Sequence, residues 1–253
     1  MMLEQVLRAT EGRVAGLPGA EEYPLPPPSS SRSLNEAIHQ KKPGNRIIAE
    51  IKYASPSAGI IRRGGDPAGF ARDFARAGAT ALSVLTEPYY FHGDAAFLPA
   101  IRPHVDLPLL RKDFIIDERQ LAESRALAAD AVLLIAGVLG DRLGDMVDLA
   151  FAYGLEPLVE VHAAHEVQEV LSTGTRLAGI NNRDLRTFRI DLGTTMKLSP
   201  LLREGGITVV SESGILWPYD IRILRPSADA FLVGSTIMRA QNPGQRLEGL
   251  IRG

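Results

Sequence analysis

The strongest constraint on the fold is a repeated pattern of short apolar runs rich in Val, Ile and Leu. Eight such runs occur after residue 46, and each has the length of one buried strand. Between neighbouring runs there is room for one helix and two loops, with capping residues and helix-ending glycines in the gaps. The runs begin at or near Ile47, Ala81, Pro108, Ala131, Pro157, Leu177, Ile207 and Ala230.

Eight alternations of strand and helix predict parallel strands joined by right-handed crossovers. Both a closed barrel and an open, doubly wound sheet have this pattern. The open sheet more often carries a glycine-rich nucleotide loop after its first strand, and none follows Ile47–Lys52. The 253 residues also match the usual size of one barrel. We therefore predict the α/β class, with a (β/α)8 TIM barrel over residues 46–253.

Residues 1–45 differ from the repeating part and predict an N-terminal helical extension packed on the barrel. Apolar spacing indicates one helix near Leu3–Leu17. A second is expected over Ser33–Lys41, with its first residue as N-cap and Glu36 completing a capping box. Between them, Pro24–Ser33 is rich in proline and serine and is typical of an extended linker. The extension is too short and too polar for a core of its own.

Composition excludes several classes of partner. The net charge is −2 without a long basic or acidic run, so we expect neither nucleic acid nor an anionic membrane as partner. No segment has the roughly 18 apolar residues that a membrane span needs, and the N-terminus lacks the apolar core of a signal peptide. The absence of cysteine excludes disulfides and thiolate metal sites. We expect a cytoplasmic monomer that binds a small molecule, without cofactor or metal.

Polar residues interrupt the apolar runs, always near the carboxyl end. A parallel strand is covered on both faces and should be almost continuously apolar. Glu50 and Lys52 are two residues apart, so their side chains point to one face of the first strand. The active sites of barrels lie at this end of the strands. The other polar residues in corresponding positions are Lys112, Glu160, Asn181, Glu212 and Ser213.

One charged residue at a strand end ordinarily marks the boundary with solvent. Two lysines and three carboxylates facing the same mouth are different, because burying them is costly unless they are paired or used. Lysines and glutamates that face each other in a pocket also shift each other's protonation, as general acid–base catalysis requires. The set therefore predicts an acid–base site.

Two glycine-containing turns follow the seventh and eighth strands, at Gly214 and Gly234. Barrels commonly bind phosphate at this pair of loops, where a short extra helix presents free N–H groups. Glycine lets the backbone approach the phosphate, Ser235 adds a hydroxyl donor, and Thr236–Arg239 is the candidate helix. Ser55, after the first strand, is either a further phosphate donor or part of an ordinary Ser-Pro turn.

Eight successive segments that cover residues 46 to about 240 carry a family resemblance. They are IIAEIKYASPSAG, SVLTEPYYFHG, LLRKDFIID, ADAVLLIA, LVEVH, GINNRDLRTF, VVSESGI and FLVGSTIMR. In these segments the chain resembles the indole-3-glycerol-phosphate synthase family. Related barrels such as phosphoribosylanthranilate isomerase share the phosphate loops, but not the Glu-x-Lys, Lys-Asp-Phe and Val-Glu-Val set.

The resemblance implies ring closure, decarboxylation and dehydration of 1-(2-carboxyphenylamino)-1-deoxyribulose 5-phosphate. It implies Lys112 as general acid and Glu160 as its acid or base partner. Lys52 would bind the substrate carboxylate or phosphate, and Glu50 would orient the lysines or a hydroxyl. Further residues that would bind substrate or support the site are Ser55, Asn181, Arg183, Glu212, Ser213, Gly214, Gly234 and Ser235.

The resemblance leaves one wall of the site and two other functions open. Pro88, Tyr89 and Phe91 suit an apolar wall for the aromatic ring of the substrate, or loop packing. A different sugar-phosphate isomerase or an aldolase would need another acid–base pair, and the aldolase a lysine that forms a Schiff base. A catalytically silent binding barrel is the third possibility, which loss of Lys112 or Glu160 would have favoured.

Overall fold

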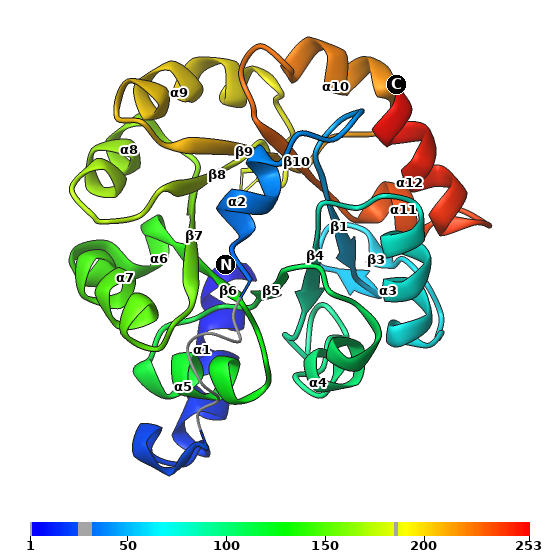
Figure 1. The fold of residues 1–253 in the computed structure, drawn as a ribbon. Helices are drawn as coiled ribbons and strands as arrows, with labels where there is room; N and C mark the ends of the chain where they lie inside the picture. Colours follow the sequence, from blue (N-terminus) through cyan, green and yellow to red (C-terminus); the bar gives the residue numbers. More distant parts are fainter. Residues whose placement is uncertain (1, 25–31, 185–186) are drawn as a thin grey trace.

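The computed structural model describes residues 2–24, 32–184 and 187–253, and eight parallel strands form a closed barrel (Figure 1). Around the barrel the strand order is β1-β10-β9-β8-β7-β6-β5-β4. The predicted (β/α)8 barrel is confirmed. Its strands are β1 Ile47–Ile51, β4 Ala81–Leu85, β5 Leu109–Lys112, β6 Ala131–Ile135, β7 Glu156–Val161, β8 Leu177–Asn181, β9 Thr208–Glu212 and β10 Ala230–Val233.

The barrel closes because β1 pairs in parallel on both of its sides. Ile48 is in register with Ala81 of β4, and Ile47 with Phe231 of β10. Closure leaves no open edge, and the surrounding helices and the packed interior cover the two faces of each strand. The eight predicted apolar runs coincide with these strands for that reason. The first loop also contains a small antiparallel hairpin, β2 Ala54–Ser55 and β3 Gly59–Ile60, which the sequence did not indicate.

Helices surround the barrel and begin at recognisable caps. Asp66 accepts a hydrogen bond from the N–H of Ala68 ahead of Pro67. Asp117 caps the helix that begins at Glu118 by accepting a hydrogen bond from the N–H of Arg119. Of the described helices, none has the length and apolarity of a membrane span. The helices are α3 Pro67–Arg76, α4 Phe97–Ile101, η3 Arg102–His104, α5 Glu118–Ala126, α6 Ala136–Leu139, η4 Gly140–Arg142, α7 Leu143–Ala152, α8 Ala164–Leu171, α9 Gly193–Glu204, α10 Pro218–Leu224, α11 Ser235–Met238 and α12 Pro243–Arg252.

Gln120 stands three residues after the N-cap Asp117, the spacing of a capping box, but its side chain does not bond to Asp117. The Gln120 side chain accepts from the N–H of Ile116 and donates to the carbonyl of Phe114. It is fully buried beneath the β5–α5 loop, where these two backbone groups need partners. Gln120 therefore stabilises the loop after Lys112 rather than the first turn of α5.

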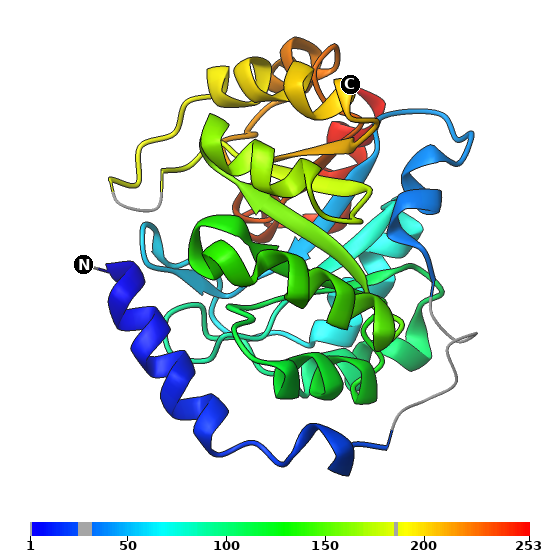
Figure 2. The ribbon, with the colours of Figure 1, turned by 90° about the vertical axis from the view of Figure 1, so that its left-hand side faces the viewer.

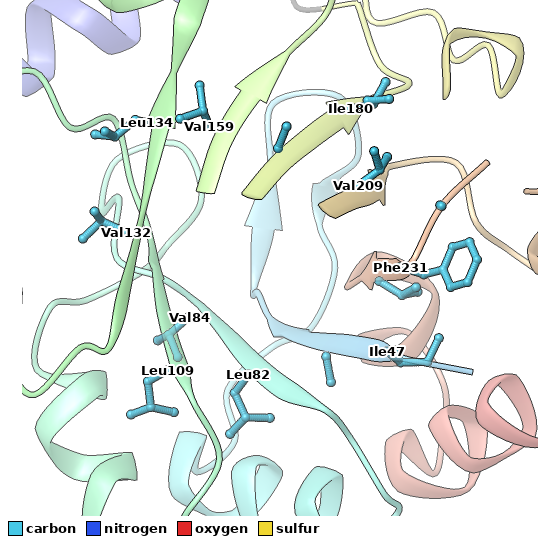
Figure 3. Packing of buried hydrophobic residues seen from close by; sticks show 14 of the residues in the cluster. Ile47, Leu82, Val84, Leu109, Val132, Leu134, Val159, Ile180, Val209 and Phe231 are labelled. Atoms are coloured by element: carbon cyan, nitrogen blue, oxygen red, sulfur yellow. The ribbon is translucent and has the colours of Figure 1, made fainter. Parts of the chain in front are cut away.

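The core has two layers because strand side chains alternate between the two faces of the barrel. The outer layer lies between strands and helices and includes Ile47, Leu82 and Val209 (Figure 3). The inner layer fills the barrel with apolar side chains at its amino-terminal end. The inward positions two residues further on are polar on several strands: Glu50 after Ile48, Lys112 after Leu110 and Glu160 after Leu158.

The N-terminal segment contacts both ends of the barrel (Figure 2). Helix α1, Met2–Ala15, lies on the side of the carboxyl ends of the strands, near the β2–β3 hairpin. After η1, Ala20–Glu22, the chain reaches α2, Leu34–His39, whose apolar side chains join the inner core at the opposite end. Ser33 caps α2 by accepting from the N–H of Glu36, as expected. Residues 25–31 of the predicted linker lie outside the described residues.

Candidate active site

A pocket of about 290 Å³ opens at the carboxyl ends of the strands. The barrel positions its lining because the last inward residue of each strand points into the same space. Apart from the proposed aromatic wall, all the residues proposed from the sequence for catalysis or binding line this pocket. They are Glu50, Lys52, Ser55, Lys112, Glu160, Asn181, Arg183, Glu212, Ser213, Gly214, Gly234 and Ser235.

Lys112 lies between two carboxylates at the inner end of the pocket. Its Nζ donates to Glu160 Oε2 at 3.1 Å and to Glu212 Oε2 at 2.6 Å. A second pair lies nearby on β1, where Lys52 Nζ is 2.5 Å from Glu50 Oε1. Each buried carboxylate is therefore close to a lysine, which offsets the cost of removing these charges from water.

Burial and mutual charge shift the ionisation of this cluster. Burial disfavours the Lys112 ammonium, but the surrounding carboxylates, Glu212 foremost, outweigh burial and raise its pKa. Burial also acts to raise the pKa of Glu160, yet Lys112 and His162 lower it to about 2. For Glu212, burial prevails over the attraction of Lys112 and raises the pKa to about 8. At neutral pH the site therefore contains an ammonium, a carboxylate and a protonated carboxyl group in contact.

Two further side chains contact the ionised Glu160. Asn181 Nδ2 donates to Glu160 Oε1 at 3.1 Å, and its own oxygen accepts from the N–H of Arg183 at 3.0 Å. His162 Nε2 lies 3.3 Å from the same Glu160 oxygen. Sequence analysis did not propose His162, although it is two residues after Glu160 and therefore on the same face of β7. Glu160 is oriented from three sides before any ligand binds.

Two glycines make room for the buried carboxylates. A Cβ on Gly179 of β8 would collide with Glu212 Oε1, and a Cβ on Gly234 would collide with Glu50 Oε1. The sequence assigned Gly234 to phosphate approach alone, and the structure adds this steric reason. Any side chain at Gly234 would displace Glu50 from Lys52.

The other end of the pocket consists of turns and a short helix. Ser213 and Gly214 both have positive φ, 64° and 83°, so the chain turns sharply after β9. Gly234 is the N-cap of α11, which forms over Ser235–Met238 where an extra helix was predicted over 236–239. The first N–H groups of a helix have no acceptor within it. Together with Ser55 and Ser57 of the β2–β3 hairpin, these groups give this end donors suited to an anion.

This arrangement of acid–base cluster and anion-binding turns can be compared with known proteins. The family model for indole-3-glycerol phosphate synthase matches residues 20–250. This chain belongs to the indole-3-glycerol phosphate synthase family. The synthase of Carboxydothermus hydrogenoformans is 45% identical over 223 residues, which cover 87% of this chain and 84% of that protein. The synthase of Dechloromonas aromatica is 44% identical over 251 residues, covering 98% and 94%.

Membership of the indole-3-glycerol phosphate synthase family makes the chain an enzyme of the carboxy-lyase class, within tryptophan biosynthesis. Within the described residues, no cluster of three or more His, Asp or Glu side chains is arranged to bind a metal. The polar side chains that line the pocket are those of lysine, arginine, glutamate, aspartate, asparagine, serine and threonine.

The aromatic wall of this family member differs from expectation. Phe91 lines the pocket with Phe114, their ring centroids 6.3 Å apart, whereas Pro88 and Tyr89 do not line it. Tyr89 is 60% exposed. The reason is Glu87, whose carboxylate accepts from the N–H groups of Tyr89, Tyr90 and Phe91 and turns the chain. Of the three residues proposed as a wall, only Phe91 is placed to contact a bound ring.

Sequence reasoning also missed parts of the lining at the mouth. Met2, Leu3 and Val6 of α1 line the pocket, although no motif marks them. Arg239, directly after α11, also lines it and brings a positive charge to the side of the phosphate turns. Arg239 could have been identified from the sequence by its position at the end of the extra helix predicted over residues 236–239.

Proposed function

We propose that the chain converts 1-(2-carboxyphenylamino)-1-deoxyribulose 5-phosphate to indole-3-glycerol phosphate, with release of CO2 and water. The observation that supports this most is the contact of Lys112 with both Glu160 and Glu212, in a pocket whose far end suits a phosphate. The reaction needs a proton donor and a base a few ångströms apart, with the substrate fixed by its charged ends. The family membership agrees with this chemistry.

In the first step, the Lys112 ammonium donates a proton to the ketose carbonyl oxygen. The ring carbon that bears the substrate carboxylate attacks the carbonyl carbon, so a C–C bond forms and the ring loses aromaticity. The electron pair of the breaking C–CO2 bond then restores the aromatic ring. Lys112 suits the donor role because its neighbours hold it as an ammonium within hydrogen-bond reach of the pocket.

Dehydration completes the reaction. The new hydroxyl group leaves as water after protonation, and a base takes a proton from the neighbouring carbon to form the C–C double bond. Glu160 is the base in our proposal, since its pKa of about 2 keeps it ionised at neutral pH. Glu212, whose pKa of about 8 leaves it protonated, is suited to return a proton to Lys112 across their 2.6 Å contact.

Binding is assigned to the remaining pocket residues. Lys52 and Arg183 supply positive charge for the substrate carboxylate, and Asn181 and Ser213 supply polar groups for hydroxyls. The phosphate would bind at the turns, where glycine backbone approaches closely and α11 begins. The residues of the phosphate subsite are Ser55, Gly214, Gly234, Ser235 and Arg239.

The direct test is a fluorescence assay for the indole product with the purified protein. Lys112→Ala and Glu160→Gln should fold normally and lose about 10²–10⁴-fold in kcat, since positioned proton donors and acceptors contribute about that much. Lys197→Ala is the matched control, because this lysine is exposed on α9 and pairs only loosely with Asp191 at 3.8 Å. Undiminished product formation by Lys112→Ala would refute its role.

The aldolase alternative has the opposite requirement for lysine. A Schiff-base lysine must lose its proton to attack a carbonyl, whereas the carboxylates around Lys112 raise its pKa and stabilise the ammonium. Borohydride should therefore trap no adduct between this protein and the substrate, and a trapped lysine adduct would favour the aldolase. Formation of indole product would exclude a silent binding barrel.

We also propose that the enzyme works as a cytoplasmic monomer. The absence of cysteine agrees with a reducing compartment, and no described helix has the length and apolarity of a membrane span. The residues that the proposal assigns to catalysis and binding all come from a single chain. Light scattering after gel filtration should give the monomer mass of 27.4 kDa, and twice that value would contradict the proposal.

A further inference from the structure

The proton balance of the proposed reaction requires a supply from solvent. The ketose oxygen receives two protons before it leaves as water, and the base recovers only one proton, from carbon. The whole reaction gives the same balance, because the substrate enters as a carboxylate and its carboxyl carbon leaves as CO2. Each turnover therefore draws one proton from solvent into the cluster of Lys112, Glu160 and Glu212.

The three groups of this cluster have little contact with solvent of their own. The exposed fractions of their side chains are 16% for Lys112, 3% for Glu160 and 2% for Glu212, and all three line the pocket. A bound substrate would cover the remaining exposure. Asn181, which donates to Glu160, is an amide and does not release protons at neutral pH. While substrate is bound, a route to solvent must therefore begin at a group that contacts the cluster from outside the pocket.

His162 contacts the cluster from outside the pocket. Its Nε2 lies 3.3 Å from Glu160 Oε1, and it does not line the pocket that the described residues form. This nitrogen is buried and, within the described part of the chain, has no hydrogen-bond partner in good geometry. The ring as a whole is 16% exposed, so solvent reaches it away from Nε2. One end of the imidazole thus faces Glu160, and another part of it faces solvent.

Glu166, in the first turn of α8, fixes the other side of the ring. Its Oε2 accepts from the N–H groups of His162 and Ala163 at 2.5 and 3.0 Å and lies 3.9 Å from His162 Nδ1. Gly137 makes room for this carboxylate, because a Cβ there would collide with Glu166 Oε1. The imidazole therefore lies between two carboxylates, Glu160 beside Nε2 and Glu166 beside Nδ1.

The chemistry of histidine suits a link between a buried carboxylate and solvent. Its charge changes near neutral pH, and its two ring nitrogens can take up a proton on one side and give one up on the other. Hydrogen bonds used in catalysis are often long or poorly aligned in an unliganded site and tighten when the ligand binds. A distance of 3.3 Å between Nε2 and Glu160 is therefore within reach of proton transfer.

We propose that His162 acts through Glu160 as a positioning residue, which holds that carboxylate and passes it a proton from solvent during turnover. The inference rests on the proposed function, since it names how the acid–base cluster of that same site regains its proton. The Nε2–H bond of the imidazolium breaks as an O–H bond of Glu160 forms, and Glu160 gives its proton to the neutral Lys112 amine. The imidazole then takes a proton from solvent.

Steady-state kinetics of His162→Gln test the proposal. Glutamine keeps a polar group beside Glu160 but cannot carry a proton, so kcat should fall about tenfold while KM stays within about twofold. His165→Gln is the matched control, because His165 is an exposed histidine in the first turn of α8, and it should leave kcat unchanged. Wild-type kcat in His162→Gln would overturn the proposal.

Rescue by added imidazole separates proton transfer from a structural role. His162→Ala leaves space where the ring was, and imidazole in the buffer should restore part of kcat in proportion to its concentration. The wild-type protein and His165→Gln should not respond. A merely structural defect would lower kcat without a response to imidazole, so absence of rescue in folded His162→Ala would overturn the proton path. If His162→Ala does not fold, the kinetics of His162→Gln decide.

Nuclear magnetic resonance of the unliganded protein tests the contact without turnover. The ring nitrogen resonances of His162 should move in Glu160→Gln, and those of His165 should stay in place. Unmoved resonances of His162 would show that the ring is not linked to Glu160 and would overturn the inference. If the wild-type protein makes no indole product, the proposed function fails, and the ring resonances still decide whether His162 is linked to Glu160.

Discussion

At the scale of single residues, the site depends on unequal ionisation of two glutamates beside one lysine. Glu160 and Glu212 both contact Lys112, yet Glu160 also accepts a hydrogen bond from Asn181 and lies 3.3 Å from His162 Nε2, and both neighbours lower its pKa. Glu212 Oε1 is buried without a hydrogen-bond partner, so burial dominates there. Environment thus gives two identical side chains different ionisation, which is the basis for our proposal of Glu160 as base and Glu212 as proton reservoir.

This difference predicts a pH dependence. As pH rises through about 8, Glu212 loses its proton, and its new charge should hold the Lys112 proton more tightly and make Lys112 a weaker acid. We expect kcat to fall above pH 8, and Glu212→Gln, which imitates the protonated form, to lack that inflection. A pH–rate profile of both proteins measures this. The proposal would be wrong if the inflection persisted unchanged in Glu212→Gln.

The same ionisation should affect stability in a defined direction. A carboxyl group with a raised pKa in the folded state binds its proton more tightly there than in the unfolded chain, so its contribution to stability is complete below the unfolded pKa and lost as pH rises through about 8. The low pKa of Glu160 acts in the opposite sense, so its contribution to stability is lost only in acid.

The sequence did not identify His162 as a site residue, because a histidine that directly follows a strand usually lies at the boundary with solvent.

At the scale of elements, the strands were predictable because helices outside the barrel and side chains inside it cover both of their faces. β6 is apolar at all five positions, and β1 is apolar except where Glu50 faces the pocket. The hairpin β2–β3 could not be predicted, since two-residue strands have no periodicity to detect. The burial of Arg111 was equally hidden, because its partners Glu123 and Thr86 come from other elements. Sequence periodicity reports on a strand's faces, not on which elements contact it.

The close approach of β8 to the Glu212 side chain of β9 leads to a prediction about Gly179. Gly179 faces Glu212 across the two strands, and Gly179→Ala would place a methyl group where the Glu212 carboxylate lies. Glu212 must then move from Lys112, so kcat should fall by at least about tenfold, with the strand pairing kept. The matched control is Ala178→Gly, on the outward face of the same strand. Steady-state kinetics would measure the effect, and wild-type kcat in Gly179→Ala would show that Glu212 is not needed in this position.

At the scale of the whole molecule, the two ends of the barrel have separate tasks. The charged inward residues lie at the carboxyl ends of the strands, and the amino-terminal end is filled with apolar side chains and covered by α2. We propose that residues 1–45 act as an appendage of the barrel at 46–253, with α1 serving the pocket and α2 the core. Arg13 and Asp113 are one hundred residues apart in the sequence, and only the folded chain brings them together. Their contact could therefore not be inferred from the sequence.

Separation of the two ends predicts that α2 can be weakened without loss of catalysis. Glu156, at the start of β7, accepts hydrogen bonds from the N–H groups of Leu34 and Asn35 and from the Ser33 hydroxyl. Glu156→Gln replaces one acceptor by an amide that faces these donors, which should cost about 1–3 kcal/mol of unfolding free energy. Glu36→Gln, on the exposed side of α2, is the control. Urea denaturation should show the loss only in Glu156→Gln, with kcat and KM unchanged, because its contacts lie at the end of the barrel opposite Lys112. A parallel fall in kcat would mean that the two ends are coupled through the inner core.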